Sequence, residues 1–481
     1  MSELKLPRTS PAQQQVSASK IMDFLDSMEQ APVELHSLMI VRHGQVVAEG
    51  WWHPYAADRL QLLYSLSKSF TSTAAGLAVE EGRLDLEAPV LSYFPEFDDV
   101  ASHPWSRTMK VRHLASMSTG HLEDALERAY HLDPAEPVRG FFGVPPEAEP
   151  GSIFAYNNIA TYVLAAIVAK VTQTRLLDYL RPRLFEPLGI AEAAWLEHPA
   201  GRTLGFSGLH LTTESVAKFG QLYLDRGGWA GTQLIPAEWV DQATRLQTPN
   251  PNEPSPDWQQ GYGFQFWMAE HGYRGDGAYG QFCIVLPQQD AVIVTTAASE
   301  DMQVVLDAVW AHLLPAFDAP DLDQGAHPSD SAAALTRRLS ELVLPRRSGE
   351  PAPNDPAAWS SLTFTPTAAA RAVFMVDSLA LEPSNGQWQG VLTDAADALA
   401  FSLGDSGWAV SEPSTSDGAV LPVAATVVWT DDDTAVVDVV FLDTPHHIAL
   451  TCSRAPRTFE AAWHTAPLHT PKPGHLRAPR T

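Results

Sequence analysis

Cysteine is almost absent from this chain, whose 481 residues include only Cys283 and Cys452. The two lie far apart, each within an apolar run typical of a strand, which favours two buried free thiols over a disulfide. No cysteines have the spacing of a metal-ligand motif. The scarcity of cysteine therefore argues against a disulfide scaffold and against a cysteine-based metal centre.

Positive charge is also scarce, since 31 Lys and Arg face 57 Asp and Glu and leave a formal net charge of −26. This balance argues against nucleic acid and against an anionic membrane surface as partners. The acidic residues are scattered, which indicates solvation rather than an acidic tail or an ion site. Charge thus excludes classes of partner without identifying a substrate.

Long hydrophobic runs are missing as well. No stretch is long enough to span a bilayer, and the first residues lack the apolar core and cleavage site of a signal peptide. The expected location is therefore cytoplasmic, with no membrane partner. We expect no cofactor and no metal, and the sequence leaves open whether the chain forms a homo-oligomer.

The distribution of apolar and turn-forming residues predicts two folded domains. We expect a polar N-terminal segment over 1–20, a first domain over 21–315, a linker with one short helix over 316–361, an all-β domain over 362–465 and a disordered tail over 466–481. In the first domain, strand-like segments flank a helical block, which predicts an α+β fold: an antiparallel sheet flanked by helices, plus a helical subdomain.

Short, regularly spaced strands in the second domain indicate a small barrel or sandwich. One of these strands is expected over 372–376. In the first domain a strand is expected over 261–267, and the linker helix is expected over 332–344.

A serine three residues before a lysine gives the first indication of chemistry, because this spacing places both side chains on one face of a helix. The pattern occurs three times, as Ser17 with Lys20, Ser65 with Lys68 and Ser215 with Lys218. If apolar neighbours desolvate the lysine, its pKa falls and it can help to deprotonate the serine. The pattern is common by chance, so the surroundings must select among the three.

Two of the matches have the surroundings of ordinary surface helices. Ser17 follows a polar stretch and is expected to cap an amphipathic helix, with Lys20 in solvent. Lys218 is expected on the wet face of a helix over 214–226, opposite a buried stripe that includes Val216 and Phe219.

Ser65 has different surroundings, because apolar residues precede it and an apolar helix follows, ending near Gly82. A lysine placed against such a core is costly and is often functional. We therefore predict Ser65 as a nucleophile and Lys68 as its activating base. A helix-capping serine with a lysine that reaches out to solvent is the structural alternative.

Tyr156-Asn157-Asn158 is the only Tyr-x-Asn sequence in the chain. It follows a turn over 150–152 and opens an apolar helix expected over 159–171. Tyr156 can exchange a proton with Ser65 if a cationic lysine lowers its pKa, and Asn158 can orient the lysine and a substrate amide or ester. A half-buried tyrosine beside a helix-capping asparagine is the alternative.

Ser65-x-x-Lys68 and Tyr156-x-Asn158 together resemble the serine β-lactamase/penicillin-binding-protein superfamily. The Tyr-x-Asn form is similar to that of the class C-like branch, which includes esterases, D-aminopeptidases and nylon-oligomer hydrolases. Segments 111–120, 185–190, 208–220 and 280–287 also resemble this family, so the likeness covers about residues 21–314. It implies a β-lactamase-like domain and an acyl-enzyme on Ser65, with Lys68 and Tyr156 as the base pair.

The third motif of that family, Lys-Thr-Gly or His-x-Gly, is altered here to Gly275-Asp276-Gly277. The final glycine lets substrate lie against the strand edge, but the cation of the first position is missing. Asp276 is expected to repel carboxylates, and Arg274 is the alternative source of a cation.

The resemblance also implies which groups contact the substrate. The backbone N–H groups of Ser65 and Ala278 would form the oxyanion hole. Asn158, Asp276, Gly277 and Ala278 are therefore the expected substrate-binding residues.

Histidines carry less information. His121 and His210 lie in segments that resemble the family and are expected near the cleft, although a single histidine is more often structural. His446 and His447 have no further ligands near them in the sequence, so no metal site is expected there.

These elements predict a serine hydrolase that forms an acyl-enzyme on Ser65, with a small ester or a peptide-like amide as substrate. β-Lactamase or DD-peptidase activity is the alternative within the family, and the missing cation argues against it. A β-lactamase-like binding or regulatory protein is a further alternative, although all four motif residues are present. An α/β-hydrolase is rejected, because Ser116 replaces the first glycine of the G-x-S-x-G elbow over 116–120.

Overall fold

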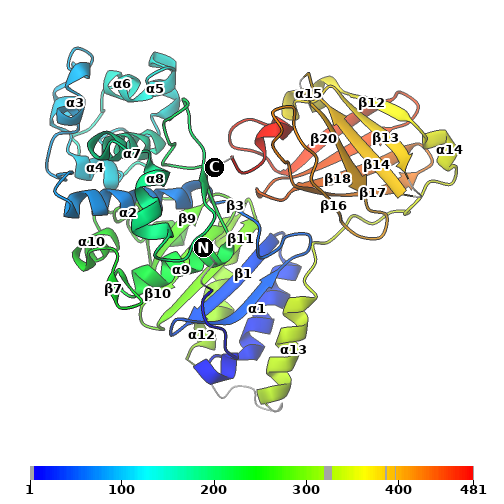
Figure 1. Ribbon diagram of the computed structural model, residues 1–481, viewed down its shortest axis with the longest axis horizontal. Coiled ribbons are helices and arrows are strands. Elements are labelled where there is room, and N and C mark those ends of the chain that lie inside the picture. Colours follow the sequence, from blue (N-terminus) through cyan, green and yellow to red (C-terminus); the bar gives the residue numbers. More distant parts are fainter. Residues whose placement is uncertain (1–4, 319–327, 385–386, 396, 480–481) are drawn as a thin grey trace.

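The computed structural model describes residues 5–318, 328–384, 387–395 and 397–479. Figure 1 shows a larger body, which combines helices with a six-stranded sheet, and a separate body built from a nine-stranded sheet. In the larger body a group of short helices lies to one side of the sheet, at the upper left of Figure 1. The expected α+β fold with a helical subdomain and an all-β second part is confirmed.

The six-stranded sheet is antiparallel, with the strand order β2-β1-β11-β10-β9-β8. Its strands are β1 (Glu34–Arg42), β2 (Gln45–Trp51), β8 (Trp267–Ala269), β9 (Gly272–Gly277), β10 (Gln281–Leu286) and β11 (Ala291–Ala298). Ile293 lies opposite Ile40 on one side and Ile284 on the other, so apolar side chains form a continuous row across the sheet. The sheet thereby joins segments that are far apart in the sequence.

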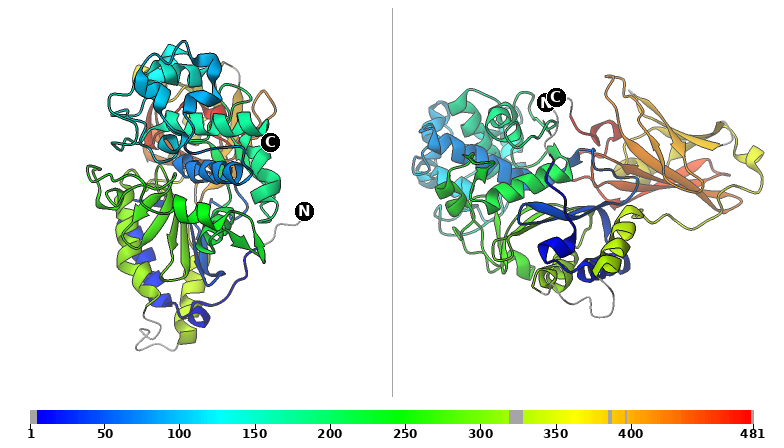
Figure 2. Two further views of the ribbon diagram at one scale, coloured as in Figure 1. Left: turned by 90° about the vertical axis from the view of Figure 1, so that its left-hand side faces the viewer. Right: turned by 60° about the horizontal axis from the view of Figure 1, so that its bottom comes forward.

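The larger body has helices on both faces of this sheet and a further group of helices beside it (Figure 2). They are α1 (Ala18–Gln30), α2 (Ser67–Glu80), α3 (Pro104–Thr108), α4 (Val111–Ala115), α5 (Leu126–Leu132), α6 (Pro137–Gly143), α7 (Asn158–Thr172), α8 (Leu176–Leu180), α9 (Thr213–Leu224), α10 (Ala237–Ala243), α11 (Met302–Ala308) and α12 (Leu314–Ala316). Two small sheets also occur. One has three strands, β3 (Gln61–Leu62), β5 (Leu209–Leu211) and β4 (Ala194–Trp195), and the other has two, β6 (Gly228–Trp229) and β7 (Thr232–Gln233).

Successive side chains of β1 contribute in turn to two hydrophobic cores, because they point to opposite faces of the sheet. Leu38 and Ile40 belong to the core that contains α1 and α11, whereas Met39 and Val41 belong to the core that contains α2 and α9. Because both faces are covered, β10 and β11 are buried along their whole length.

Helix α2 is buried along most of its length although many of its residues carry hydroxyl groups. These hydroxyls donate to backbone carbonyls of the surrounding loops: Thr71 to Gly205, Ser72 to Phe264 and Ser69 to Gln265, over 2.6 to 2.9 Å. Buried polar groups are tolerated when they are hydrogen-bonded in this way. The hydroxyl-rich sequence thus anchors α2 to two loops, one at Gly205 and one at Phe264 and Gln265.

The second sheet has the order β15-β14-β13-β12-β20-β19-β18-β17-β16. Its strands are β12 (Leu362–Pro366), β13 (Ser378–Ser384), β14 (Gln387–Thr393), β15 (Ala398–Leu403), β16 (Ala409–Ser411), β17 (Val423–Asp431), β18 (Thr434–Phe441), β19 (His447–Ser453) and β20 (Thr458–Thr465). Gly404, which follows β15, bridges to Thr426 on β17, so the two ends of the sheet approach each other. The sheet is therefore a nearly closed barrel, one of the two forms expected.

Two segments predicted as strands have other structures. Of residues 261–267, all but the last form a loop before β8, which begins at Trp267, because Gly261 and Gln265 adopt left-handed conformations with φ of 102° and 64°. Residues 372–376 begin in helix α15 (Ala368–Val373), where the Thr367 side chain caps the helix by accepting from the Ala370 N–H. The alanine-rich sequence of α15 favours a helix.

The connection between the bodies contains α13 (Pro328–Ser340) and the short α14 (Pro356–Trp359). The helix α13 begins and ends four residues earlier than expected. It packs against α1 and β2, with Leu335 in the core of the first body. The two cysteines are buried and free, as expected.

The C-terminal residues differ from the expected disordered tail. Residues 466–479 follow a defined path that includes a 3₁₀ turn at Pro473–His475. The Leu476 side chain is buried in the core of the second body, and the Ala478 N–H donates to Asp443 over 2.9 Å. Apolar contacts and hydrogen bonds therefore order a segment whose composition alone indicates disorder.

Among the described residues, no helix is both long enough and apolar enough to cross a membrane.

Gly76 in α2 gives a test of this packing. A Cβ atom at this position would lie 2.4 Å from the ring of the buried Trp239 on α10. In an exposed helix, alanine in place of glycine stabilises by about 1 kcal/mol. Here we expect the opposite sign, because the tryptophan ring must move: Gly76→Ala should lower the free energy of unfolding by about 1–3 kcal/mol, measured by denaturant titration.

Gly407→Ala is the control, since a Cβ atom there meets no atom within 4 Å. It should change the free energy of unfolding by less than about 0.5 kcal/mol. An unchanged or increased stability of Gly76→Ala would contradict the packing described.

Candidate active site

Ser65 lies in the 3₁₀ turn η2 (Tyr64–Leu66), immediately before α2. Its neighbour Tyr64 has φ of 47°, a left-handed conformation that residues other than glycine seldom adopt. The turn is held by hydrogen bonds from the Leu63 N–H to the Leu209 carbonyl (2.8 Å) and from the Leu66 N–H to the Leu63 carbonyl (3.1 Å). The strained turn places Ser65 just before the N-terminus of α2.

Lys68 lies one turn further along, and its side chain is buried, with 1% of the residue exposed. Its Nζ donates to Ser65 Oγ over 2.9 Å, to Asn158 Oδ1 over 2.7 Å and to the Phe206 carbonyl over 3.0 Å. All three donor positions of the amino group are thus engaged. The alternative of a lysine that reaches out to solvent is excluded.

The surroundings of Lys68 change its acidity. Burial lowers its pKa to about 7, although the carboxylates of Asp124 and Asp276 act in the opposite direction. A substantial fraction of the side chain is therefore uncharged near neutral pH. An uncharged amine 2.9 Å from a serine hydroxyl can accept its proton.

Tyr156 lies on the other side of this pair. Its ring centre is 4.7 Å from Lys68 Nζ, and the ring stacks on Trp267 at 5.3 Å. Burial raises the pKa of Tyr156, and the hydrogen bond with Ser65 offsets this only in part. The condition that a cationic lysine lowers this pKa is therefore not met, and the phenol keeps its proton at neutral pH.

Asn158 is the first residue of α7, and Asp124 in the loop before α5 fixes its side chain. Asp124 accepts from the backbone N–H of Asn158 over 3.0 Å and from its side-chain Nδ2 over 2.6 Å. This leaves Asn158 Oδ1 as the acceptor for Lys68, the orienting contact expected from the sequence. The sequence reasoning did not identify Asp124, because no motif connects it with residues that follow more than thirty positions later.

The altered third motif lies on β9. Asp276 is buried and accepts from Arg274 Nε over 3.1 Å, while Arg274 is fully buried against the Trp258 ring. Burial raises the pKa of Asp276 to about 6, with Arg274 acting against this shift. Arg274 therefore neutralises its own neighbour and does not supply a free cation, which answers the alternative left open by the sequence.

The glycines of β9 allow a close approach to the nucleophile segment. A Cβ atom on Gly277 would lie 2.1 Å from the Leu63 carbonyl oxygen, and one on Gly275 would lie 2.2 Å from the Leu66 side chain. The tight contact brings the start of the turn after β9, at Ala278, close to the Ser65 turn. The assignment of the Ser65 and Ala278 N–H groups as an oxyanion hole stays a prediction.

The other two Ser-x-x-Lys sequences do not form such a site. Ser17 caps α1 by accepting from the Lys20 N–H, and Lys20 pairs with Asp23 at 2.8 Å, as expected for a surface helix. Lys218 is fully buried and donates to the Gly189 carbonyl over 3.2 Å, so its expected solvent exposure is wrong. Helix α9 is covered on both sides, which an amphipathic pattern cannot reveal.

The two histidines expected near the cleft have different roles. His121 is buried beside Thr119 and the Val144 carbonyl, at 2.9 and 3.2 Å, which is a structural position. His210 is also buried but lines a cavity, and its Nε2 has no hydrogen-bond partner among the described residues.

Residues of the second body complete the surroundings of the nucleophile turn. The Tyr64 hydroxyl forms a hydrogen bond with His446 Nε2 over 2.8 Å and accepts from the Leu468 N–H over 3.4 Å. The Tyr279 hydroxyl donates to the Ala466 carbonyl over 2.5 Å. The residues on both sides of the expected oxyanion hole are thus bound to the C-terminal part of the chain.

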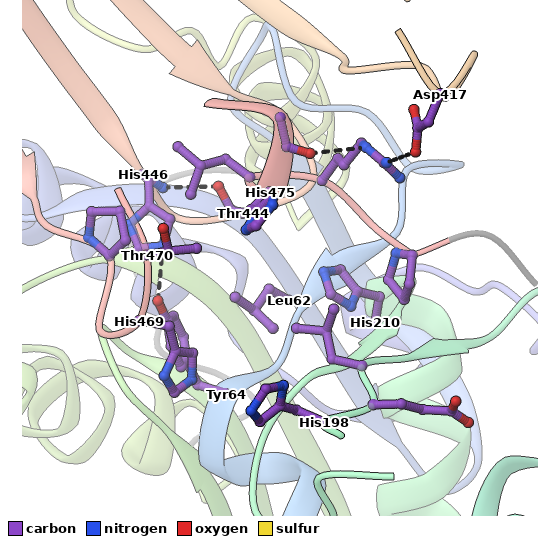
Figure 3. A pocket seen from close by; sticks show the side chains of 17 residues that line it. Leu62, Tyr64, His198, His210, Asp417, Thr444, His446, His469, Thr470 and His475 are labelled. Atoms are coloured by element: carbon purple, nitrogen blue, oxygen red, sulfur yellow. Dashed lines mark hydrogen bonds and ion pairs between the residues drawn. The ribbon is translucent and has the colours of Figure 1, made fainter. Parts of the chain in front are cut away.

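A cavity of about 480 Å³ lies between the two bodies, beside this turn (Figure 3). Tyr64, His198 and His210 line it from the first body, and His446 and His469 line it from the second. Figure 3 shows Tyr64 and His469 at one side of the cavity, next to each other. The cavity therefore adjoins the nucleophile turn and is shaped by both parts of the chain.

Comparisons with known proteins agree with this geometry. The Beta-lactamase family profile matches residues 26–316. The 6-aminohexanoate-dimer hydrolase of Paenarthrobacter ureafaciens is 26% identical over 317 residues, which cover 61% of this chain and 80% of that protein. Lovastatin esterase of Penicillium rubens is 25% identical over 171 residues, 31% of this chain and 43% of that protein.

A solved structure from Bacillus anthracis, provisionally named 6-aminohexanoate-dimer hydrolase, shares the fold. It has a TM-score of 0.55 and 21% identity, and the likeness covers 67% of this chain and 90% of that one. The profile match spans more than half of the chain and contains Ser65, Lys68, Tyr156 and Asn158. The chain therefore belongs to the beta-lactamase family of serine hydrolases.

Proposed function

We propose that the protein hydrolyses small esters or peptide-like amides through an acyl-enzyme on Ser65. The observation that carries this proposal is the contact between Lys68 Nζ and Ser65 Oγ, 2.9 Å apart, in surroundings that lower the pKa of the lysine to about 7. A buried amine of this kind is a suitable general base at neutral pH.

In the proposed reaction, Ser65 Oγ attacks the substrate carbonyl carbon and its proton passes to Lys68 Nζ. The oxyanion collapses and expels an alcohol or amine, which takes a proton from Tyr156, and Lys68 returns a proton to the phenol. Water then attacks the acyl-enzyme with the same groups acting in the reverse direction. Tyr156 acts here as a proton carrier between neutral forms, because its raised pKa disfavours the phenolate.

The substrate class follows from the charges near Ser65. The third motif carries no free cation, since Arg274 is buried and paired with Asp276. Arg274 neutralises Asp276, and the Asp124 carboxylate faces Lys68, so the site has no surplus of positive charge to bind a substrate carboxylate. Substrates without a carboxylate beside the scissile carbonyl are therefore favoured over β-lactams. The names of the two curated relatives, a dimer hydrolase and an esterase, support the same choice.

Turnover of nitrophenyl acetate and butyrate tests the proposal. The wild-type protein should release nitrophenol, and Ser65→Ala should lose at least about a thousandfold in kcat/KM, since the covalent route is removed. Ser17→Ala is the matched control, because Ser17 belongs to the same sequence pattern but caps α1. It should retain wild-type turnover.

Labelling with a fluorophosphonate probe separates the enzyme from a binding protein with the same fold. Labelling of wild type that is lost in Ser65→Ala supports the proposal, and no labelling of wild type contradicts it. Faster turnover of nitrocefin than of every ester in the panel would instead favour β-lactamase activity.

The pH dependence of kcat/KM tests the role of Lys68. The pKa of Lys68 is about 7, so at lower pH the lysine is protonated and cannot accept the serine proton. Below pH 7, kcat/KM should therefore rise about tenfold per pH unit, and above pH 7 it should level off. A profile for nitrophenyl acetate between pH 5 and 8.5 measures this. A flat profile over that range would contradict Lys68 as the base.

Asp124 provides a variant that should move this profile. Its carboxylate raises the pKa of Lys68, so Asp124→Asn should shift the rising limb to lower pH. The Asp124 side chain is exposed, so the variant should fold, and a shifted pH profile would report the change in charge. Glu123→Gln, which removes the adjacent exposed carboxylate, is the control and should leave the limb in place. An unshifted limb in Asp124→Asn would exclude this electrostatic coupling.

A further inference from the structure

A second cluster of titratable side chains lies where the two bodies meet, outside the Ser65 site. It consists of Asp438 on β18, His447 on β19 and His464 on β20, whose potential ligand atoms all lie within 4.8 Å of one another. Asp438 and His447 are buried, whereas His464 is exposed. Two imidazoles and a carboxylate are ligands typical of zinc.

The strand register explains why the sequence did not reveal this cluster. His447 pairs with Thr465, but the next residue, Ile448, pairs with Trp463, so His464 is an extra residue in a β-bulge. A bulge re-aims a side chain and here brings His464 beside His447, with ring centres 4.1 Å apart. The expectation that His447 lacks further ligands is therefore wrong, because its neighbours come from adjacent strands.

A carboxylate from the other body orients His447. His447 Nδ1 lies 2.9 Å from Glu34 Oε2 on β1, and the other carboxylate oxygen of Glu34 is 3.1 Å from His36 Nε2. A histidine that binds a metal through one nitrogen commonly donates the other N–H to a carboxylate in this way. Once the ring has lost its extra proton, Glu34 fixes the tautomer in which Nε2 is available.

The other ring nitrogen of His447 faces a second member of the cluster. His447 Nε2 is buried without a hydrogen bond and faces Asp438 Oδ1 at 3.6 Å. Ligand atoms around a tetrahedral zinc ion, each about 2.0–2.2 Å from the metal, are separated by a similar distance. A cavity of about 640 Å³ borders the cluster, with the carboxylates of Glu300 and Asp301 in its lining, and provides a path for entry.

We propose that Asp438, His447 and His464 bind one Zn²⁺ ion, with the fourth position open to the cavity. The exposed His464 ring has to turn, since the stacked arrangement does not direct both imidazole lone pairs at one point. Because Glu34 belongs to the first body and the three ligands to the second, the ion would strengthen the junction between them.

Two positive groups compete with the ion. Arg347 contacts both oxygens of Asp438 at 3.1 and 3.3 Å and has to leave one of them for the metal. Burial opposes a charge on His447, but the carboxylates of Asp438 and Glu34 outweigh it and raise its pKa to about 9. Zinc must therefore displace a proton, as is usual for histidine ligands.

Titration of the metal-free full-length protein with Zn²⁺, in competition with a chromophoric chelator, tests the proposal. Wild type should bind one ion per chain, and Co²⁺ should give the visible absorption bands of a tetrahedral site. His464→Asn should weaken binding at least about tenfold. We choose His464→Asn because it alters an exposed side chain, so the variant should fold. Asp438→Asn is less suitable, because it leaves the Arg347 side chain unpaired and can destabilise the fold.

His131→Ala is the matched control, because it removes an exposed histidine of α5 far from the junction in the sequence. It should bind zinc as wild type does. Saturating zinc should raise the melting temperature of wild type and of His131→Ala, but not that of His464→Asn. Wild type that binds no stoichiometric zinc, or an affinity unchanged in His464→Asn, would overturn the proposal.

Discussion

The burial of one amino group is the constraint on which the rest of the site depends. Lys68 sits in a position with almost no contact with water, where a charged ammonium is costly and each donor must have a partner. Ser65, Asn158 and the Phe206 carbonyl provide those partners. The same burial that disfavours the charged ammonium gives the amine a pKa near neutrality, which its proposed role as a base requires. The stability cost and the proposed chemistry therefore have one cause.

Several parts of the fold serve this arrangement. The hydroxyl-rich helix α2 is fixed by loop carbonyls on its buried sides, and the glycines of β9 let the strand approach the Ser65 turn closely. Asp124 and Asp276 restore part of the lost stabilisation of the charged lysine. The balance between burial and these carboxylates keeps the pKa of Lys68 near neutrality instead of far below it.

The sequence was sufficient where a function is encoded by neighbours in the chain. Ser65 and Lys68 are one helical turn apart, and the apolar residues around them indicate burial, so the pair could be predicted. The α+β fold and the all-β second part also follow from local patterns.

The sequence was insufficient where contacts depend on packing between distant elements. Lys218 follows a regular amphipathic pattern, yet a second layer covers the face expected to be wet. Asp124 reaches Asn158 across a loop, and a β-bulge decides the direction of His464. The ordered C-terminal segment has a composition typical of disorder and is held by contacts with residues more than thirty positions away.

The hydrogen bonds of the Tyr64 hydroxyl have a consequence for the order of events during synthesis. Its partners are His446 and Leu468, which lie 382 and 404 residues later in the chain. As the protein emerges from the ribosome, the Ser65 turn leaves the exit tunnel long before the residues that hold its neighbour. The nascent chain therefore carries Ser65 without its finished surroundings over several hundred residues of synthesis, and the turn acquires its final contacts only after residues 446 and 468 have emerged.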